Sequence, residues 1–430
     1  MIKFKWEKEF KETEIGELPK EWEMTALGDK SKFTIIMGQS PPSKYYNQNG
    51  DGIPFIQGKK EFGDLYVKTE TYTTKCAKIA PPYSVLITVR APVGELNITK
   101  GRFCIGRGVA AVFNKNRLLL ENRFIYYVLK GLNRYLSMLG ERGTTYDSIT
   151  KEELDNFAVP FPKSVERSSI ASVLSWFDDL IENKKRQNDI LEKTAMAVFK
   201  SWFIDFEPFK DSGFVDSELG KIPKTWKVRS IGKIADFRNG LSYKGVEKFS
   251  EPTGYLFITL NNVLEGGGFK PEYSWIKSNR IKEHHFLKEG DLIIANTEQT
   301  KVGRLVGCPA LVTFPYDYKK EKGVYSHHIT KITPKDKLYK LFLYLYLKIT
   351  QQETATFHTG TSVWGLDIEN LKRNKLVVIP PKSILERFHN VINPLFKKIT
   401  INEKQIMVLR KIRDVLLPLL VFGRLRVEEI

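Results

Sequence analysis

The sequence predicts an α+β protein with a pseudo-two-fold internal repeat, in which two similar globular domains are separated by a pair of long antiparallel coiled-coil helices. Three observations predict this fold. A nine-residue segment is written twice, the same kinds of element follow each copy in the same order, and each half ends in a long heptad pattern. The length of 430 residues agrees, because one hydrophobic core rarely serves a chain of this size.

The repeated segment opens each half of the chain. It reads EIGELPKEW at 14–22 and ELGKIPKTW at 218–226, with Glu, Gly, Pro, Lys and Trp at matching positions. The other apolar positions are also kept, because Leu219 and Ile222 take the places of Ile15 and Leu18. Since this segment is constant in both halves, we predict a structural or docking role for it.

The elements that follow each copy keep their order and kind, which indicates duplication. Each half continues with a β-like run, a turn containing Val-Gly, an aromatic helical segment, a Gly-Thr turn and a strand that runs into proline. In the first half these are YSVLITVR (83–90), APVGEL (91–96), NRFIYYVLKGL (122–132), RGTTYDSITKEEL (142–154) and NFAVPFPKS (156–164). In the second half they are GDLIIANT (290–297), TKVGRL (300–305), KLFLYLYLKI (340–349), TGTSVWGLDIENL (359–371) and KLVVIPPKS (375–383).

After these prolines, each half carries apolar residues at alternating spacings of four and three. Eight of the ten seam positions in each half are apolar, which is typical of a coiled coil. About 38 helical residues span about 57 Å at the usual rise. The first seam comprises Ile170, Leu174, Phe177, Ile181, Lys184, Asn188, Leu191, Ala195, Val198 and Trp202. The second comprises Phe388, Ile392, Leu395, Ile399, Asn402, Ile406, Leu409, Arg413, Leu416 and Leu420.

We expect the two seams to pair antiparallel, because the first helix leads into the second domain and the other leaves it. In full register Asn188 faces Asn402, a polar layer that fixes register at some cost in stability. Pro394 could kink the second helix or delay its start, and Pro418 is predicted to end it. The alternative is that each helix packs on its own domain as a core helix.

These patterns divide the chain into four parts. The boundaries are a first domain at 1–163, a spacer helix at 164–206, a second domain at 207–383 and a second spacer helix at 384–430. The loops of the two domains differ, because the stretch MGQSPPSKYYNQNGDGIPFIQGKKEFG at 37–63 has no close copy in the second half.

The charge of the chain indicates a polyanionic partner. The sequence holds 68 Lys and Arg against 50 Asp and Glu, a formal net charge of +18. Phosphates attract such an excess whatever the base sequence, so double-stranded DNA is the first partner to consider. Two different domains held about 50 Å apart would suit a split site, because one turn of B-DNA spans about 34–36 Å. We therefore expect a bipartite, asymmetric target.

The cysteines and the apolar segments point to a reducing cytoplasm without a membrane. Cys76, Cys104 and Cys308 are scattered and odd in number, without a CxxC pair, which argues against a disulfide framework or a zinc site. The start, MIKFKWEKEF, lacks the apolar core of a signal peptide. No stretch reaches the roughly 18 apolar residues that span a bilayer.

Several stretches together resemble the specificity (S) subunits of Type I restriction-modification systems. They are EIGELPKEW with its repeat, GQSPPSKYYNQNG, FIQGKKEFG, VLITVRAPVGELNI with IGRGVAA, GTSVWGLDIENL, AVFKSWFIDFEP and IRDVLLPLLVFGRLRV. The resemblance covers nearly the whole chain. It implies two target-recognition domains joined by two paired helices, and docking of two methyltransferase subunits that methylate adenine with S-adenosylmethionine. A translocase-nuclease subunit adds restriction where the system has one.

The resemblance implies that the chain is not an enzyme and binds no cofactor itself, and a search for catalytic motifs agrees. An adenine methyltransferase needs an N/D-PP-Y/F turn, but IAPPY (79–83), IPPK (379–382) and QSPPS (39–43) lack the Asn or Asp. A phosphate-cradling GxxxxGK[ST] loop is also missing. The pairs His284-His285 and His327-His328 suit a shared metal poorly, because adjacent side chains point to opposite faces of a strand. No metal site is predicted.

Basic and amide side chains beside glycines are the predicted DNA contacts. Glycine lets the backbone approach a phosphate while the neighbouring side chain reaches a base edge. In the first half these residues are Lys59, Lys60, Arg90 and Arg107, and Thr144, Thr145 and Tyr146 of the Gly-Thr turn are added to them. In the second half they are Lys301, Arg304, Asn261 and Asn262, and Thr361 and Trp364 of the second Gly-Thr turn are added to them. The alternative for each is a surface charge or a turn that stabilises the fold.

The function predicted from the sequence is therefore a cytoplasmic DNA specificity subunit of a Type I complex. One rival is a stand-alone bipartite DNA-binding protein without methyltransferase partners. A second rival is a fused enzyme with a hidden nuclease or methyltransferase centre, which the missing motifs disfavour.

Overall fold

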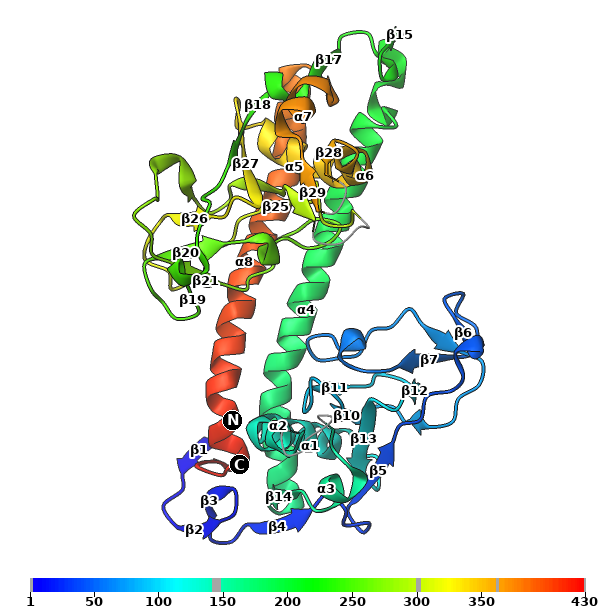
Figure 1. The fold of residues 1–430 in the computed structure, drawn as a ribbon, viewed down its shortest axis with the longest axis vertical. Coiled ribbons are helices and arrows are strands. Elements are labelled where there is room, and N and C mark those ends of the chain that lie inside the picture. The colour runs from blue at the N-terminus through cyan, green and yellow to red at the C-terminus, as the bar shows by residue number, and fades with distance from the viewer. Residues whose placement is uncertain (1–2, 141–147, 299–302, 361–362, 429–430) are drawn as a thin grey trace. The chain divides into compact units, whose positions relative to one another are not determined.

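The computed structural model divides the chain into two compact units, each of which combines one domain with part of each long helix (Figure 1). Unit 1 comprises residues 1–182 and 409–430, and unit 2 comprises residues 183–408. The structure describes all residues except 1–2, 141–147, 299–302, 361–362 and 429–430. No helix in the described part of the chain is long and apolar enough to span a membrane.

The described residues of unit 1 form two larger β-sheets, several two-stranded pairs and, besides the long helices, three short α-helices. Its four-stranded sheet has the order β11 (Leu96–Ile98), β10 (Val85–Thr88), β13 (Val109–Asn114), β5 (Phe33–Met37). Its five-stranded sheet has the order β6 (Tyr46–Asn47), β8 (Tyr72–Thr73), β7 (Ile53–Ile56), β12 (Phe103–Ile105), β9 (Ile79–Ala80). The strands β2 (Phe10–Thr13) and β3 (Gly16–Pro19) form a hairpin, and β4 (Glu23–Ala26) pairs antiparallel with the distant β14 (Ala158–Phe161). The helices are α1 (Leu119–Gly131), α2 (Asn133–Gly140) and α3 (Lys151–Asp155).

Unit 2 repeats this arrangement. Its four-stranded sheet has the order β25 (Pro309–Leu311), β23 (Leu292–Ala295), β27 (Ile329–Pro334), β18 (Ala235–Asn239). Its five-stranded sheet has the order β19 (Lys248–Phe249), β21 (Ser274–Ile276), β20 (Tyr255–Ile258), β26 (Gly323–Tyr325), β22 (Phe286–Leu287). Two smaller pairs are β15 (Phe214–Ser217) with β16 (Gly220–Pro223) and β17 (Lys227–Ser230) with β30 (Leu376–Ile379). A three-stranded sheet has the order β24 (Thr297–Glu298), β29 (Trp364–Leu366), β28 (His358–Thr359). The helices are α5 (Tyr339–Ile349), α6 (Gln351–Ala355) and α7 (Ile368–Asn374).

The strand orders of the two units correspond one to one, which supports the predicted duplication. A pair of glycines shows how close the correspondence is. A Cβ on Gly38 would lie 2.2 Å from the Gly106 carbonyl oxygen, and a Cβ on Gly240 would lie 2.3 Å from the Tyr325 carbonyl oxygen. Each glycine therefore allows the end of its strand, β5 or β18, to lie against the turn that precedes β13 or β27.

The two long helices are α4 (Ser164–Phe203) and α8 (Lys382–Val421), each of 40 residues. Within unit 2 they run antiparallel, because Asn188 contacts Asn402 while Phe199 contacts Phe388 further along. Asn402 Nδ2 donates to Asn188 Oδ1 at 2.8 Å, which is the polar layer that full register predicts. All twenty seam residues are buried or partly buried.

Two predictions about α8 differ from the structure. The helix starts at Lys382 and continues through both Pro394 and Pro418, so Pro418 does not end it. The last turn survives the loss of one backbone donor because Leu420 and Val421 are fully buried in the unit 1 core.

The alternative prediction, that each long helix packs into a domain core, is also correct in part. The first half of α4 buries Ile170 and Leu174 in the core of unit 1, and its second half buries Phe199 and Phe203 in the core of unit 2. In each unit a helix of the domain, α1 or α5, lies beside α4, as Tyr127–Asp178 and Tyr344–Glu192 hydrogen bonds show (Figure 1). The helices therefore pair with each other and also complete the two domain cores.

The repeated nonapeptide buries one tryptophan in each unit. Trp22 is 1% exposed, and its Nε1 donates to Glu166 Oε2 at 3.0 Å at the start of α4. Trp226 packs against Phe203 and Phe209 near the end of the same helix. These contacts give the repeated segment a structural role.

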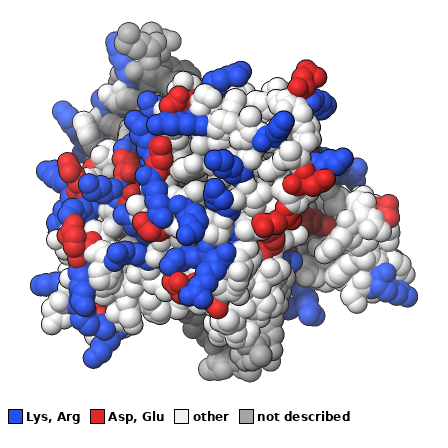
Figure 2. Space-filling view, turned by 90° about the horizontal axis from the view of Figure 1, so that it is seen from above, with Lys and Arg blue, Asp and Glu red and all other residues white. Residues whose placement is uncertain are grey.

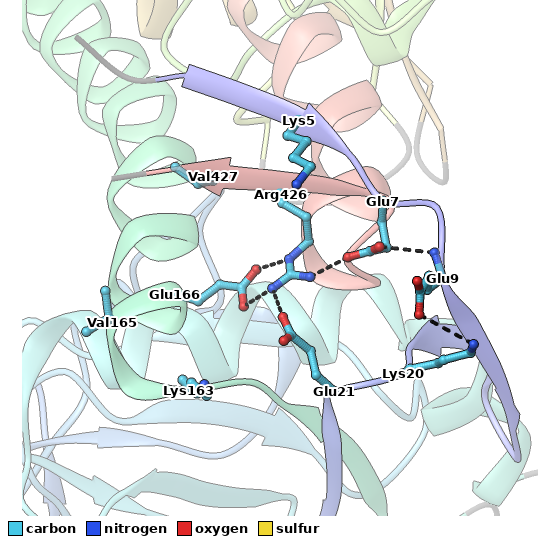
Figure 3. Close-up of a pocket in the computed structure, with 10 residues that line it drawn as sticks. All are labelled: Lys5, Glu7, Glu9, Lys20, Glu21, Lys163, Val165, Glu166, Arg426 and Val427. Atoms are coloured by element: carbon cyan, nitrogen blue, oxygen red, sulfur yellow. Dashed lines mark hydrogen bonds and ion pairs between the residues drawn. The ribbon is translucent and has the colours of Figure 1, made fainter. Parts of the chain in front are cut away.

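The prediction of a spacer helix over all of 384–430 was wrong at its end, because α8 stops at Val421 and a strand follows it. This strand, β31 (Leu425–Glu428), pairs antiparallel with β1 (Lys3–Trp6). Figure 3 shows Arg426 of β31 in a pocket, where its guanidinium forms ion pairs with Glu7, Glu21 and Glu166. The two distant chain segments are thus joined by a backbone ladder and by one arginine.

The cysteine prediction was wrong for one pair. Cys76 and Cys104 form a disulfide with a Cα–Cα distance of 5.6 Å, while Cys308 is free and buried. The bond joins the start of the β9 region to β12, because these two strands are paired.

Candidate DNA-binding surfaces

Three of the predicted DNA contacts of unit 1 line one groove. The groove has a volume of about 570 Å³, and we call it the Arg90–Arg107 groove. Its lining residues are Ser40, Pro41, Pro42, Ser43, Tyr46, Gln57, Gly58, Lys59, Arg90, Ala91, Arg107 and Gly108. The structure thus brings together residues from four separate loops that the sequence spreads over some 70 positions.

Backbone hydrogen bonds hold the two arginines in position. Arg107 lies in the turn between β12 and β13, and its N–H donates to Ser40 Oγ at 3.1 Å. Arg90 follows β10 and forms an antiparallel bridge with Ser148. Both arginines are exposed, so their backbones are fixed while their side chains face solvent.

Nine of the twelve residues that line the groove were not among the predicted contacts, and three of these nine form a chain of hydrogen bonds. Gln57 Nε2 donates to Tyr46 Oη at 3.2 Å, and Tyr46 Oη donates to the Pro41 carbonyl at 2.8 Å. The Glu61 carboxylate accepts the N–H of Gln57 at 3.2 Å and of Gly58 at 3.1 Å, which fixes the loop that carries Lys59. Pro41 and Tyr46 both lie in the stretch GQSPPSKYY, so the sequence could have indicated that this stretch belongs to the site. The hydrogen bond between Tyr46 and Gln57 could not be predicted, because only the fold brings these two residues together.

The two lysines next to this loop differ in their surroundings. Lys59 is exposed and forms an ion pair with Glu95, which offsets part of its charge. Lys60 is also exposed, in the same one-turn helix (Lys59–Glu61).

The charges that line the groove favour a phosphate-bearing ligand. Lys59, Arg90 and Arg107 are its charged lining residues, and none of the lining residues is acidic. The pocket of Figure 3 is different, because four glutamates line it with four cations and Arg426 is already paired. More widely, Lys and Arg side chains are spread over the face shown in Figure 2, with Asp and Glu in smaller groups. Of the two pockets, the Arg90–Arg107 groove is the one suited to DNA.

The predicted contacts of unit 2 differ in how far they are exposed. Asn261 and Arg304 are exposed. Trp364 is half-buried and stacks on His358, with ring centroids 3.9 Å apart. Its ring also lies against Gly303, where an added Cβ would be 2.4 Å from the indole.

Asn262 is a correction to the predicted contacts. Its side chain is 1% exposed, its Oδ1 accepts the Thr259 N–H at 2.8 Å, and its Nδ2 donates to the carbonyls of Lys270 and Glu272. All of its hydrogen bonds are therefore inside the domain. Asparagine often caps a turn in this way, and the sequence Asn-Asn does not show which of the two amides is the cap.

Five predicted contacts lie outside the described residues. They are Thr144, Thr145, Tyr146, Lys301 and Thr361.

Comparison with known proteins decides the family. Residues 19–193 and 223–411 match the model of the Type I restriction modification DNA specificity domain. The chain belongs to the Type I specificity subunit family. A relative in Methanocaldococcus jannaschii, the Type I restriction enzyme MjaIX specificity subunit, is 35% identical over 100% of this chain and 99% of its own length.

Other specificity subunits agree with this assignment. The HindI specificity subunit of Haemophilus influenzae is 25% identical over 73% of this chain and 79% of its own length. The crystal structure of the S subunit from M. genitalium has the same fold, with a TM-score of 0.56 and 18% identity over 93% of this chain and 96% of that chain. The two matched segments of the family model correspond to the two α+β domains, which are the target-recognition domains of this subunit.

Proposed function

We propose that this specificity subunit reads a bipartite, asymmetric DNA site, one part with each target-recognition domain, and docks two adenine methyltransferase subunits. The partners would bind S-adenosylmethionine, and a translocase-nuclease subunit would join where the system has one. The chain itself contributes recognition and not catalysis, in the cytoplasm where the chromosome lies. The observation that carries the proposal is the Arg90–Arg107 groove, a cationic groove on a domain that occurs twice with different loops.

Guanidinium groups give this groove a specific means of reading bases. Arginine donates two parallel hydrogen bonds to O6 and N7 of guanine, which is the commonest specific contact in the major groove. Gln57 offers the matching amide pair for adenine, with its donor already oriented by Tyr46. The groove therefore suits a half-site with at least one purine contact.

The outer faces of the long helices offer a surface for the methyltransferase partners. Within unit 1, Trp176, Leu180 and Val415 are 55%, 47% and 59% exposed. The domain contacts α4 at other positions, because Tyr127 and Arg123 bond to Asp178 and Asp179 and leave Trp176 uncovered. Apolar side chains left exposed on a helix commonly mark an interaction site, and a partner helix would cover them.

The first experiment is a methylation map of DNA from cells that express this chain with its neighbouring methyltransferase. A new adenine mark at a split, asymmetric motif is expected, and cells without this chain should lack it. If the partner is active but no new mark is found, the rival of a stand-alone DNA-binding protein is favoured. The purified chain alone should neither nick DNA nor consume S-adenosylmethionine, and turnover by the chain alone would favour the fused-enzyme rival.

Replacing Arg90 by alanine tests the groove directly. The variant should relax one half-site and leave the other unchanged, because a bidentate base contact gives about 1–3 kcal/mol of discrimination, or about 5- to 150-fold. Arg102→Ala is the matched control, since Arg102 is exposed at the opposite end of β12 from Arg107. An unchanged motif with Arg90→Ala would remove this residue from the site.

A further inference from the structure

We propose that His327 and His328 form the base-reading element of the second target-recognition domain, in the place that Arg107 and Gly108 hold in the first. This inference rests on the proposed function and goes further, because it names specificity residues that the sequence motifs did not identify.

Matching backbone hydrogen bonds establish the equivalence. In each domain three bonds hold the turn that precedes the long strand of the four-stranded sheet. In the first domain they are Gly106 N–Ile56 O (2.7 Å), Val89 N–Gly108 O (2.9 Å) and Gly38 N–Val109 O (2.9 Å). In the second domain they are Ser326 N–Ile258 O (2.9 Å), Asn296 N–His328 O (3.0 Å) and Gly240 N–Ile329 O (3.2 Å). His327 therefore occupies the position of Arg107.

The same register identifies the counterpart of Arg90. Since Asn296 corresponds to Val89, the next residue, Thr297, corresponds to Arg90. The paired runs YSVLITVR and GDLIIANT end on these same two residues, although Lys301 and Arg304, and not Thr297, were predicted from the sequence among the second-half contacts. The two arginine positions of the first groove thus carry a threonine and a histidine in the second domain.

Thr297 and His328 are in direct contact. Thr297 Oγ1 lies 2.8 Å from His328 Nδ1 and 3.1 Å from Asn296 Oδ1. Asn296 is buried and donates to the His327 carbonyl at 2.9 Å and to Thr330 Oγ1 at 3.0 Å. Because Nδ1 of His328 is engaged in this network, Nε2 is the ring nitrogen left for a ligand.

Packing holds the His327 ring. It lies 3.9 Å from the ring of His328 and 5.9 Å from that of Tyr243, measured between centroids. Its Nδ1 is buried without a hydrogen-bond partner in the described part of the chain. Both histidines are half-buried, so their rings are positioned by the domain while part of each remains accessible.

The chemistry of this pair differs from that of the first groove. An imidazole donates or accepts a single hydrogen bond at Nε2, whereas a guanidinium donates two in parallel. The second domain would therefore recognise a base edge such as purine N7 with a single directed hydrogen bond. Two domains with one topology would then read two different half-sites.

The test is a methylation map with His327→Gln and His328→Asn, expressed with the wild-type partner. Both variants keep a polar side chain at the substituted position. Lys335→Ala is the control, because β27 separates Lys335 from His328. At about 3.3 Å per residue, the two residues lie about 20 Å apart along this strand. We expect degeneracy or at least a fivefold loss of methylation at the second half-site, with the first half-site and the control unchanged.

Two results would overturn the inference. One is an unchanged motif and methylation level with both variants. The other is equal loss at both half-sites together with a lowered melting temperature, which would show that the pair supports the fold and does not read bases. Failure of the proposed function is a separate outcome, because then the wild-type chain itself would direct no bipartite mark.

Discussion

Replacing Asn402 and Asn188 by alanine, singly and together, measures how strongly the polar layer couples α4 to α8. Asn402 is fully buried, and its donation to Asn188 Oδ1 at 2.8 Å is the hydrogen bond between the two seam amides. Asn188 Nδ2 also donates to Glu403 Oε1 at 2.7 Å. Asn402→Ala leaves Asn188 Oδ1 without this donor, and Asn188→Ala leaves Asn402 Nδ2 with only the longer bond to Gln187 Oε1 at 3.4 Å, so each substitution should cost about 1–3 kcal/mol of unfolding free energy.

The double variant removes both members of the pair, so its loss should be smaller than the sum of the two single losses. We expect a coupling free energy of about 1 kcal/mol, the usual net value of a buried hydrogen bond. The helix propensities of alanine and asparagine cancel in such a cycle.

The assay is urea unfolding of the purified full chain, followed by far-ultraviolet circular dichroism. Asn183→Ala is the matched control, since Asn183 is exposed on the same helix, and it should change the free energy by less than about 0.5 kcal/mol. Single losses that add within about 0.3 kcal/mol would show that the two amides do not interact, and the polar layer would not fix the register.

Three further predictions concern the helices and one loop. Asp178→Ala should lower the unfolding free energy of unit 1 by about 3–5 kcal/mol, measured by thermal or urea unfolding, because the partly buried Arg413 loses its ion-pair partner at 2.5 Å. A loss below about 1 kcal/mol would mean that Asp414 alone compensates the charge of Arg413. One heptad inserted in phase into both helices should lengthen the spacer of the methylated motif by about 3 base pairs, from about 10 Å of helix, and altered half-site sequences would contradict this ruler. Hydrogen bonds from Ser31 lower the pKa of Asp29 to about 2, so its stabilisation is present above about pH 4 and is lost as the pH falls toward 2. Asp29→Asn should remove this part of the acid dependence, and an identical acid unfolding curve would refute the assignment.

Periodicity and duplication made the large features of this fold predictable. The heptad positions identified both long helices and the Asn188–Asn402 layer, because a helix repeats its contacts every few residues whatever surrounds it. The repeated anchors identified two domains of one topology, since each anchor recurs in the same order. Arg90 and Arg107 were predicted as DNA contacts from their glycine-rich turns; the structure places both in one groove, and their contact with DNA stays a prediction.

Features that depend on distant pairing could not be predicted in this way. The strands β1 and β31 are four residues each and have no sequence signal that joins one to the other. The Cys76–Cys104 bond depends on the pairing of β9 with β12. Asn262 and Asn261 differ in role only through the turn that buries one of them. The equivalence of His327 with Arg107 required the hydrogen-bond register, because the two turns share no residues.

The joining of β1 to β31 has a consequence for how the subunit folds during synthesis. Unit 2 is one continuous stretch, 183–408, and can fold once that stretch has left the ribosome. Unit 1 also needs Leu417, Leu420, Val421 and Leu425 to complete its core, and these residues follow its first part after roughly 200 others. At about 5–20 residues per second the first domain waits on the order of 10–40 s with part of its apolar core uncovered. The nascent chain therefore completes its second domain before its first, and chaperones would have most to shield at the end that was made earliest.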